Sequence, residues 1–472
     1  MTLAGQAPGA LGQSTPDIRT VTLVVALGIG VITQTALALM YGSAPGSARD
    51  TWSVALALSF LLAIPGAGVI WATWRARHVP AGWPMGLVIA VAGLIMRAPY
   101  FGAGPMLEDD HFRYLLDGAM VARGLSPYAF APEALLRGAD GVPPQLVEAG
   151  WTVIAAINFP ELRSMYPGAA QALFALSHVI APWSVDGLRV VILIAEALTT
   201  LLIWRLLALA GRPPQLVALY WCNPLMAFCL TGQAHIDAAL AAPIMVALSA
   251  AHRRLGLLAG LGLGLAVGIK LWPILLAPLI ARMLWPDRRA LAAFALALGA
   301  ATLALCGPLL WASLSADAGL TAYAGGWSVN NAPYAWLSYT FFLLAGPGTG
   351  EIVLRALIIL AAAGASLAVA FRSLEGLEMM VGRAAILGAV LFYLSPAQFP
   401  WYAAWFVPLA VASGSPVLVV ATVGLPVYYL FFPLAAAGLR DVHGYGLAAV
   451  HLVPVLVLAM LTRRTSRPEA MA

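Results

Sequence analysis

Charged residues are scarce in this chain of 472 residues, of which only 10% are Asp, Glu, Lys or Arg. A soluble globular domain usually carries about a quarter charged residues, so this composition excludes one. Lysine occurs once, at Lys270, and cysteine three times, at Cys222, Cys229 and Cys306. The cysteines lie within apolar runs, which excludes a disulfide framework and predicts buried thiols. The pI of about 9.2 does not indicate a nucleic-acid partner, because the basic residues stand at the ends of apolar runs.

Long apolar runs take the place of the missing charge, and 62% of the residues are hydrophobic. These runs are continuous, whereas the strands of a membrane β-barrel alternate apolar and polar residues. The sequence therefore predicts an all-α fold, with residues 1–472 forming a single integral membrane domain of about 12–14 spans. The predicted spans are 20–41, 52–74, 84–100, 188–206, 214–232, 235–252, 255–269, 271–285, 289–312, 352–372, 380–396, 401–412, 415–433 and 444–462.

The positive-inside rule orients these spans. If the N-terminus is cytoplasmic, most arginines fall on the cytoplasmic side and both termini share that side. These arginines are Arg19, Arg75, Arg77, Arg205, Arg212, Arg253, Arg254, Arg282, Arg288, Arg289, Arg372, Arg383, Arg463, Arg464 and Arg467. The segments 101–187 and 313–351 then form the first and second large extracytoplasmic loops. Both are too long for simple turns and rich in aromatic residues that suit the headgroup level, so we expect interfacial or re-entrant helices in them.

The densest polar stretch, residues 108–118, directly follows an apolar span in the first of these loops. Charge near a bilayer is costly and is kept where function needs it. Asp109 and Asp110 are adjacent carboxylates, and such a pair suits acid–base chemistry because each raises the pKa of the other. The alternative is a solvated loop that merely ends a helix. We favour a catalytic carboxylate at Asp109 or Asp110.

Arg113, Tyr114 and Asp117 follow the carboxylate pair at helical spacing. This spacing places Asp110, Arg113 and Asp117 on one helical face. Arg113 is a candidate ligand for an anion, with Tyr114 and Asp117 in supporting positions. The alternative is a structural ion pair between Arg113 and Asp117.

Lys270, His235 and Asp237 are further polar residues at the ends of apolar runs on the extracytoplasmic side. Lys270 opposes the positive-inside bias, which makes it a candidate anion ligand, although a snorkelling lysine would also stand at a helix end. His235 and Asp237 could serve catalysis, or Asp237 could cap a helix beside a buried histidine. Two residues at this spacing do not make a metal site, so no metal is assigned.

Several blocks between residues 100 and 410 resemble, in their order, the GT-C class of membrane glycosyltransferases, and within it the bacterial α-mannosyltransferases of the mycobacterial lipoglycan type. The blocks are Asp109–Gly118, Gly124–Tyr128, Ile157–Leu162, Met165–Pro167, Asn223–Leu225, Gly232–Asp237, Gly268–Pro273, Leu394–Pro396 and Pro400–Tyr402. The chain departs from the family pattern at Leu116, where a tryptophan is common, and at Gly168, where a second proline is common.

The resemblance implies a catalytic aspartate in the first loop, a polyprenyl-phosphate sugar donor, and a lipid or glycan acceptor at the outer face of a bacterial plasma membrane. It favours mannose as the sugar. Tyr128 and Tyr166 lie in matching blocks and are taken as supporting residues. Trp401 and Tyr402 are candidates to stack on a sugar, although as interfacial anchors they need no such role.

The chemistry of such a reaction agrees with these residues. The leaving phosphate needs cations, which Arg113, Lys270 or His235 could supply, and the acceptor hydroxyl needs a base. Direct displacement would invert the anomeric centre. The residues indicate no cofactor, and a dependence on a divalent metal is left open. The main alternative is a transporter or lipid flippase without catalysis, which would more often show internal repeats. A lipid-linked glycan polymerase or ligase of another fold is a second alternative.

Overall fold

The computed structural model describes residues 17–43, 51–79, 82–105, 107–415 and 417–465. The regular structure within them is helical, without a β-strand. The α-helices are α1 (Ile18–Ser43), α2 (Trp52–Ala76), α3 (Trp83–Arg97), α4 (Asp110–Val121), α5 (Pro132–Leu136), α6 (Pro144–Ala155), α7 (Gly168–Ile180), α8 (Val185–Leu209), α9 (Ala218–Trp221), α10 (Pro224–Met226), α11 (Ala241–His252), α12 (Gly256–Ile269), α13 (Ala277–Leu284), α14 (Arg288–Ala312), α15 (Gly319–Gly326), α16 (Ala332–Ala345), α17 (Thr349–Phe371), α18 (Gly376–Leu394), α19 (Val407–Ala412), α20 (Ala421–Gly424), α21 (Phe431–Ala436), α22 (Arg440–Tyr445) and α23 (Leu452–Thr465).

Within the described ranges, eight helices are long and apolar enough to cross a membrane, or up to nine if a bent pair forms one span. The eight are Ile18–Met40, Trp52–Ala76, Trp83–Tyr100, Val185–Leu209, Arg288–Ala312, Thr349–Phe371, Gly376–Leu394 and Leu418–Ala436. The all-α, polytopic fold is therefore confirmed. The apolar runs predict about 12–14 spans. The described residues contain fewer long helices, because several of the runs are divided into shorter helices.

The predicted boundary between spans 214–232 and 235–252 is a sharp bend in the structure. Helices Pro224–Gly232 and Ile236–His252 meet at an angle of 106°. Before the bend the helix widens into a π turn over Ala227–Gly232, and at the bend Ala234 adopts a φ of 60°. Such left-handed backbone is uncommon outside glycine. The bend leaves His235 buried between two helix ends, at the turn that the span boundaries predict.

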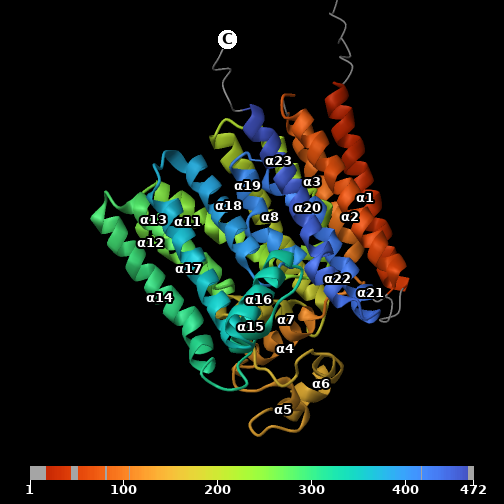
Figure 1. Ribbon diagram of the computed structural model, residues 1–472, viewed down its shortest axis with the longest axis vertical. Helices are drawn as coiled ribbons and strands as arrows, with labels where there is room; N and C mark the ends of the chain where they lie inside the picture. The colour runs from red at the N-terminus through yellow and green to blue at the C-terminus, as the bar shows by residue number, and fades with distance from the viewer. Residues whose placement is uncertain (1–16, 44–50, 80–81, 106, 416, 466–472) are drawn as a thin grey trace, which may run out of the picture.

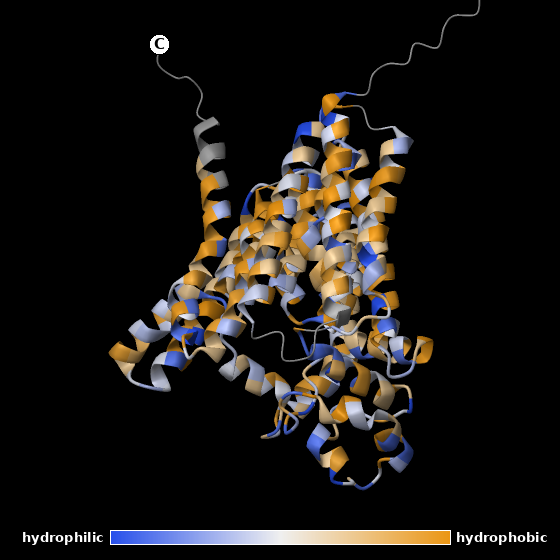
Figure 2. Ribbon diagram, turned by 90° about the vertical axis from the view of Figure 1, so that its right-hand side faces the viewer, coloured by the Kyte–Doolittle hydropathy of each residue, from blue (hydrophilic) through white to orange (hydrophobic). Residues whose placement is uncertain are grey.

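The long helices lie side by side, and several of the short helices gather at one end of them. In Figure 1, α4 to α7, α15 and α16 lie at the lower end, whereas α1 begins and α23 ends at the upper end. Figure 2 shows hydrophobic residues along the long helices and more hydrophilic residues at the lower end. The segments 101–187 and 313–351, predicted as loops, thus hold the short helices α4 to α7, α15 and α16. The chain's first and last residues, predicted to be cytoplasmic, lie outside the described residues.

Four glycines let α12 approach α14 closely. A Cβ atom on Gly256 would lie 1.8 Å from the Ala290 carbonyl oxygen, and one on Gly260 would lie 2.6 Å from that of Phe294. Gly264 and Gly268 follow at the same spacing and would meet side chains of α14. Small residues every fourth position permit this kind of close packing in membranes. The packing holds the C-terminal end of α12, where Lys270 follows.

A buried ion pair joins two of the long helices. Arg97 of α3 and Glu196 of α8 lie 2.5 Å apart, and both side chains are completely buried. Arg97 also donates to the Trp221 carbonyl oxygen at 2.7 Å, and the Thr231 hydroxyl donates to Glu196 at 2.5 Å. The sequence analysis assigned no role to this pair. It holds the π turn against α3 and α8, and so fixes the start of the bend.

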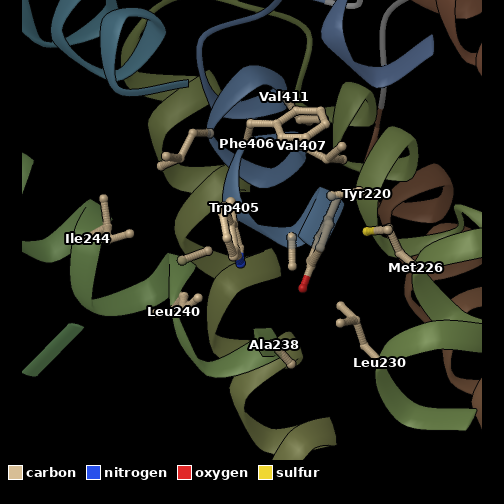
Figure 3. Close-up of a cluster of buried hydrophobic side chains, with 14 of the residues drawn as sticks. Tyr220, Met226, Leu230, Ala238, Leu240, Ile244, Trp405, Phe406, Val407 and Val411 are labelled. Carbon is tan, nitrogen blue, oxygen red and sulfur yellow. The ribbon is translucent and has the colours of Figure 1, made fainter. Parts of the chain in front are cut away.

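Figure 3 shows the apolar core around that bend. Leu230, Leu240 and Phe406 are each fully buried there. The labelled residues are Tyr220, Met226, Leu230, Ala238, Leu240, Ile244, Trp405, Phe406, Val407 and Val411. Tyr220 comes from α9, and the others come from the bent pair and from the segment of η7 (Pro400–Trp405) and α19. Trp405 also donates its indole N–H to Asp237 at 2.8 Å, so this core positions a charged residue.

Candidate active site

A recess with a cavity of about 240 Å³ opens among the short helices. The start of α4, the loop 158–166, α15 and the segments 399–402 and 428–432 form its walls. Its lining residues are Leu107, Glu108, Asp109, Asp110, Arg113, Asn158, Phe159, Leu162, Arg163, Met165, Tyr166, Gly319, Tyr323, Trp327, Phe399, Trp401, Tyr402, Tyr428 and Phe432. Residues from distant parts of the sequence therefore share one wall with the predicted carboxylate pair.

Asp109 and Asp110 stand where α4 begins, and both line the recess. Asp109 accepts a hydrogen bond from the Asn158 amide at 2.8 Å. Asp110 accepts one from the Tyr114 hydroxyl at 3.5 Å, and its Oδ2 lies 3.7 Å from Nδ1 of His235. Burial within the recess, followed by the negative charge of Asp109, raises the pKa of Asp110 to about 7. A carboxyl with a pKa near neutrality suits general-base chemistry.

Arg113 points its guanidinium to the loop that forms the opposite wall. It donates to the Leu162 carbonyl oxygen at 3.0 Å and to that of Phe159 at 3.2 Å. Asp117 is buried and accepts from Ser164 and, at 2.8 Å, from Gln171. The two residues therefore bind separate partners instead of forming the ion pair considered above. Asp117 ties α4 to the loop behind the recess.

Three tyrosines hold α4 against α7 and the loop before it. The Tyr128 hydroxyl donates to the Tyr166 carbonyl oxygen at 2.7 Å, and the Tyr166 hydroxyl lies 3.4 Å from that of Tyr114. Tyr114 stacks on Phe174 of α7 with ring centroids 4.5 Å apart. Of the three tyrosines, Tyr166 lines the recess, whereas Tyr114 and Tyr128 pack behind it.

Lys270 lies behind the recess wall, held by an acidic and an aromatic partner. Its Nζ is 2.5 Å from Oδ1 of Asp237 and 4.0 Å from the ring centroid of Tyr402. Tyr402 lines the recess and exchanges a hydrogen bond of 2.7 Å with Tyr323 of α15. Lys270 is therefore not itself a lining residue of the recess, but it contacts the recess wall at Tyr402.

His235 is fully buried beside Asp110, and both of its ring nitrogens lack a hydrogen-bond partner within the described structure. Its ring stacks on Trp401 with centroids 3.8 Å apart and planes 9° apart. Trp401 lines the recess. The capping role considered for Asp237 is wrong, because its Oδ1 accepts instead from Lys270 and Trp405.

The sequence analysis missed Arg163, a second arginine of the recess. It pairs with Asp317 at 2.6 Å and donates to the Tyr128 carbonyl oxygen at 3.3 Å. Trp327 of the second predicted loop also lines the recess and packs on Phe159 at 4.7 Å. The position of Arg163 could have indicated it, because it is a basic residue on the side of the membrane opposite to the arginine-rich loops. Nothing in the sequence pattern indicated Trp327.

No group of three or more His, Cys, Asp or Glu residues suited to hold a metal ion occurs in the described parts of the chain. The three cysteines are buried and free, as predicted. The recess thus combines carboxylates, arginines and aromatic rings, a set that fits the hydroxyl groups, anionic leaving group and ring faces of an activated sugar.

Fold and recess together define an integral membrane protein with a polar recess at one end of its helical bundle. More than half of the chain, residues 19–286, matches the family model MptA_B, described as alpha-(1->6)-mannopyranosyltransferase, N-terminal domain. The chain belongs to this family and is a glycosyltransferase, which confirms the resemblance seen in the sequence. Comparisons with curated proteins and with solved structures gave no match.

Proposed function

We propose that the protein transfers mannose from a polyprenyl-phosphate donor to a lipid or glycan acceptor, forming an α-(1→6) linkage on the extracytoplasmic side of a bacterial plasma membrane. The observation that carries this proposal is the placement of Asp109 and Asp110 in one recess with Arg113 and Arg163. A base and a cationic anion site are the two functions that this displacement needs. The family description supplies the sugar and the linkage.

Asp110 is the base in this proposal. It takes the proton of the acceptor hydroxyl while that oxygen attacks C1 of the sugar. The bond between C1 and the phosphate oxygen breaks, and its electron pair leaves with the lipid phosphate. Attack from the side opposite the phosphate inverts C1, so a β-linked donor gives an α-glycoside. Asp109 raises the pKa of Asp110 and accepts a hydrogen bond from the Asn158 amide.

Arg113 and Arg163 bind the leaving phosphate. A guanidinium has five N–H donors, and Arg113 uses two of them on the carbonyl oxygens of the opposite wall. The remaining N–H groups of Arg113 can face a ligand in the recess. Charge-assisted hydrogen bonds to phosphate strengthen as negative charge develops in the transition state. Lys270 lies behind Tyr402, and His235 lies behind Trp401. Each sets the position of its neighbouring ring and the electrostatic field around it.

The distribution of arginines supports the extracytoplasmic placement. Arg19 lies near the start of α1, and Arg75 lies in the last turn of α2. Arg205 and Arg253 likewise lie near the far ends of α8 and α11 from the recess. The positive-inside rule assigns this arginine-rich end to the cytoplasm. The recess then faces the other side, where a lipid-held donor and the acceptor would meet.

Transfer from a labelled polyprenyl-phosphate mannose to an alkyl α-mannoside, by the purified full chain, tests the proposal. We expect transfer by the wild type, none by Asp109→Asn/Asp110→Asn, and normal transfer by Asp441→Asn. Asp441 is an exposed carboxylate of α22, outside the recess, and serves as the matched control. Equal transfer by the double variant and the wild type would overturn the proposal, as would wild-type inactivity with every polyprenyl-phosphate hexose tried.

A further inference from the structure

A second groove lies on the lobe formed by α5 and α6, apart from the recess. It encloses about 640 Å³. Figure 1 places this lobe at the lower end of the molecule, beyond α4 and α7. The groove is lined by Leu135, Leu136, Gly138, Ala139, Asp140, Gly141, Val142, Pro144, Val147, Glu148 and Trp151. No residue described above as part of the recess contributes to it.

The lobe packs on α4 through a small core that the two share. Leu135, Leu146 and Ile154 are almost completely buried in that core. Trp183, with a φ of 57°, packs on Gly150, where a Cβ atom would lie only 2.2 Å from its ring. The groove therefore rests on fixed elements, and its shape is set before any ligand binds.

We infer that this groove binds the glycan acceptor, as a chain of neutral hexoses that continues from the recess. Trp151 is 53% exposed in the groove, and the flat face of an indole suits the C–H face of a sugar ring. Asp140 and Glu148 offer carboxylate oxygens that accept hydrogen bonds from sugar hydroxyls. The inference rests on the proposed function only for the nature of the acceptor.

The charges of the groove favour this occupant over a lipid headgroup. Its lining has two carboxylates and neither lysine nor arginine, so an anionic phosphate or phospholipid surface would be repelled. The position beyond the ends of the long helices in Figure 1 also disfavours an acyl chain. A neutral, hydroxyl-rich ligand can stack on the aromatic face and donate hydrogen bonds to the carboxylates.

The backbone connects the groove directly to the recess. From Trp151 to the end of α6 at Ala155 is about 6 Å of helix, and the next residues, Asn158 and Phe159, line the recess. On the other wall, the Glu133 N–H at the start of α5 donates to the Pro160 carbonyl oxygen at 2.9 Å. A glycan chain in the groove would thus place its non-reducing end toward Asp110.

Equilibrium binding of an α-(1→6)-linked mannotetraose to the purified full chain, measured by titration calorimetry without donor, tests this inference. We expect Trp151→Ala to weaken binding about tenfold or more, as for a truncated aromatic anchor, and Trp151→Phe to retain most of it. Trp311→Ala is the matched control, because Trp311 is 79% exposed outside the groove. Equal affinity of Trp151→Ala and wild type would overturn the inference, and so would absence of wild-type binding.

Transfer assays separate this inference from the proposed function. With Trp151→Ala, the KM for the tetraose acceptor should rise about tenfold, while kcat and the KM for a single alkyl mannoside stay unchanged. Failure of the wild type to transfer to either acceptor would count against the proposed function alone, since binding of the tetraose is measured without turnover. An equal rise of KM for both acceptors would overturn the groove assignment.

Discussion

Two buried charged clusters in this protein differ in how completely their polar atoms are paired. In the pair of Arg97 and Glu196, the guanidinium and the carboxylate bind each other and neighbouring groups. Around the recess, both ring nitrogens of His235 and one oxygen of Asp237 lack a partner within the described structure. Buried polar groups without partners cost free energy. In the first cluster the charged groups are paired within the protein, whereas in the second some buried polar atoms have no partner among the described residues.

The largest effect should come from Asp110→Asn. A positioned general base contributes about 10²–10⁴-fold to a rate, so kcat should fall by about that factor. The melting temperature should stay the same or rise, because a neutral amide replaces a carboxyl that burial disfavours as an anion. Radiolabel transfer and thermal unfolding of the same preparation check both results. A variant with near-normal kcat would move the role of base to Asp109.

Substitutions in the buried pair of Arg97 and Glu196 should change the stability of the protein. Glu196→Leu leaves Arg97 buried and unpaired, which should lower the free energy of unfolding by about 3–5 kcal/mol, whereas a double replacement by leucines should recover most of it. The exposed pair of Arg137 and Glu133 is the control, and Glu133→Gln should cost less than about 1 kcal/mol. Thermal and denaturant unfolding of the three variants and the wild type measure this. A single variant as stable as the double one would contradict the comparison.

The recess should also show a pH dependence that the structural pair lacks. Asp110 must be ionised to accept a proton, so kcat/KM should fall about tenfold for each pH unit below its pKa of about 7 and level off above it. Asp109→Asn removes a negative neighbour, so the acidic limb should move to lower pH. An unmoved limb in the pH–rate profile would show that another group titrates.

Stability should change in the opposite sense over the same range. The pKa of Asp110 is higher in the folded chain than in the unfolded one, so its contribution to stability is present at low pH. That contribution declines as pH rises through about 7. The melting temperatures of wild type and Asp110→Asn should converge below about pH 4. They should separate as pH rises from there to about 7 and stay apart above it.

The smallest effect concerns His235→Leu. Removing an unpartnered polar ring from a buried site should raise the free energy of unfolding by about 1 kcal/mol, while kcat/KM falls about tenfold because Asp110 and Trp401 lose their neighbour. This trade of activity against stability is opposite to the behaviour of Glu196→Leu. A loss of stability together with unchanged transfer would place His235 among the structural residues.

Much of the recess could be predicted from local sequence. The adjacent carboxylates, the lone lysine and the aromatic pair at 401–402 are unusual for an apolar chain, and all lie in or beside the recess. Arg163, Asn158 and Trp327 escaped prediction because their types are ordinary in loops. Only the pairing of Arg163 with Asp317 and the packing of Trp327 on Phe159 bring them to the wall.

The sequence alone determined the class of the protein, its all-α membrane fold and the acidic motif, because apolar run length and the cost of charge in a bilayer are local properties. Tertiary structure decided which runs are broken, and it placed Lys270 against Asp237 and His235 against Trp401. The bend at 232–236 depends on long-range packing, including the bond of Thr231 to Glu196 and the core around Trp405. Such contacts cannot be inferred from a residue's neighbours along the chain.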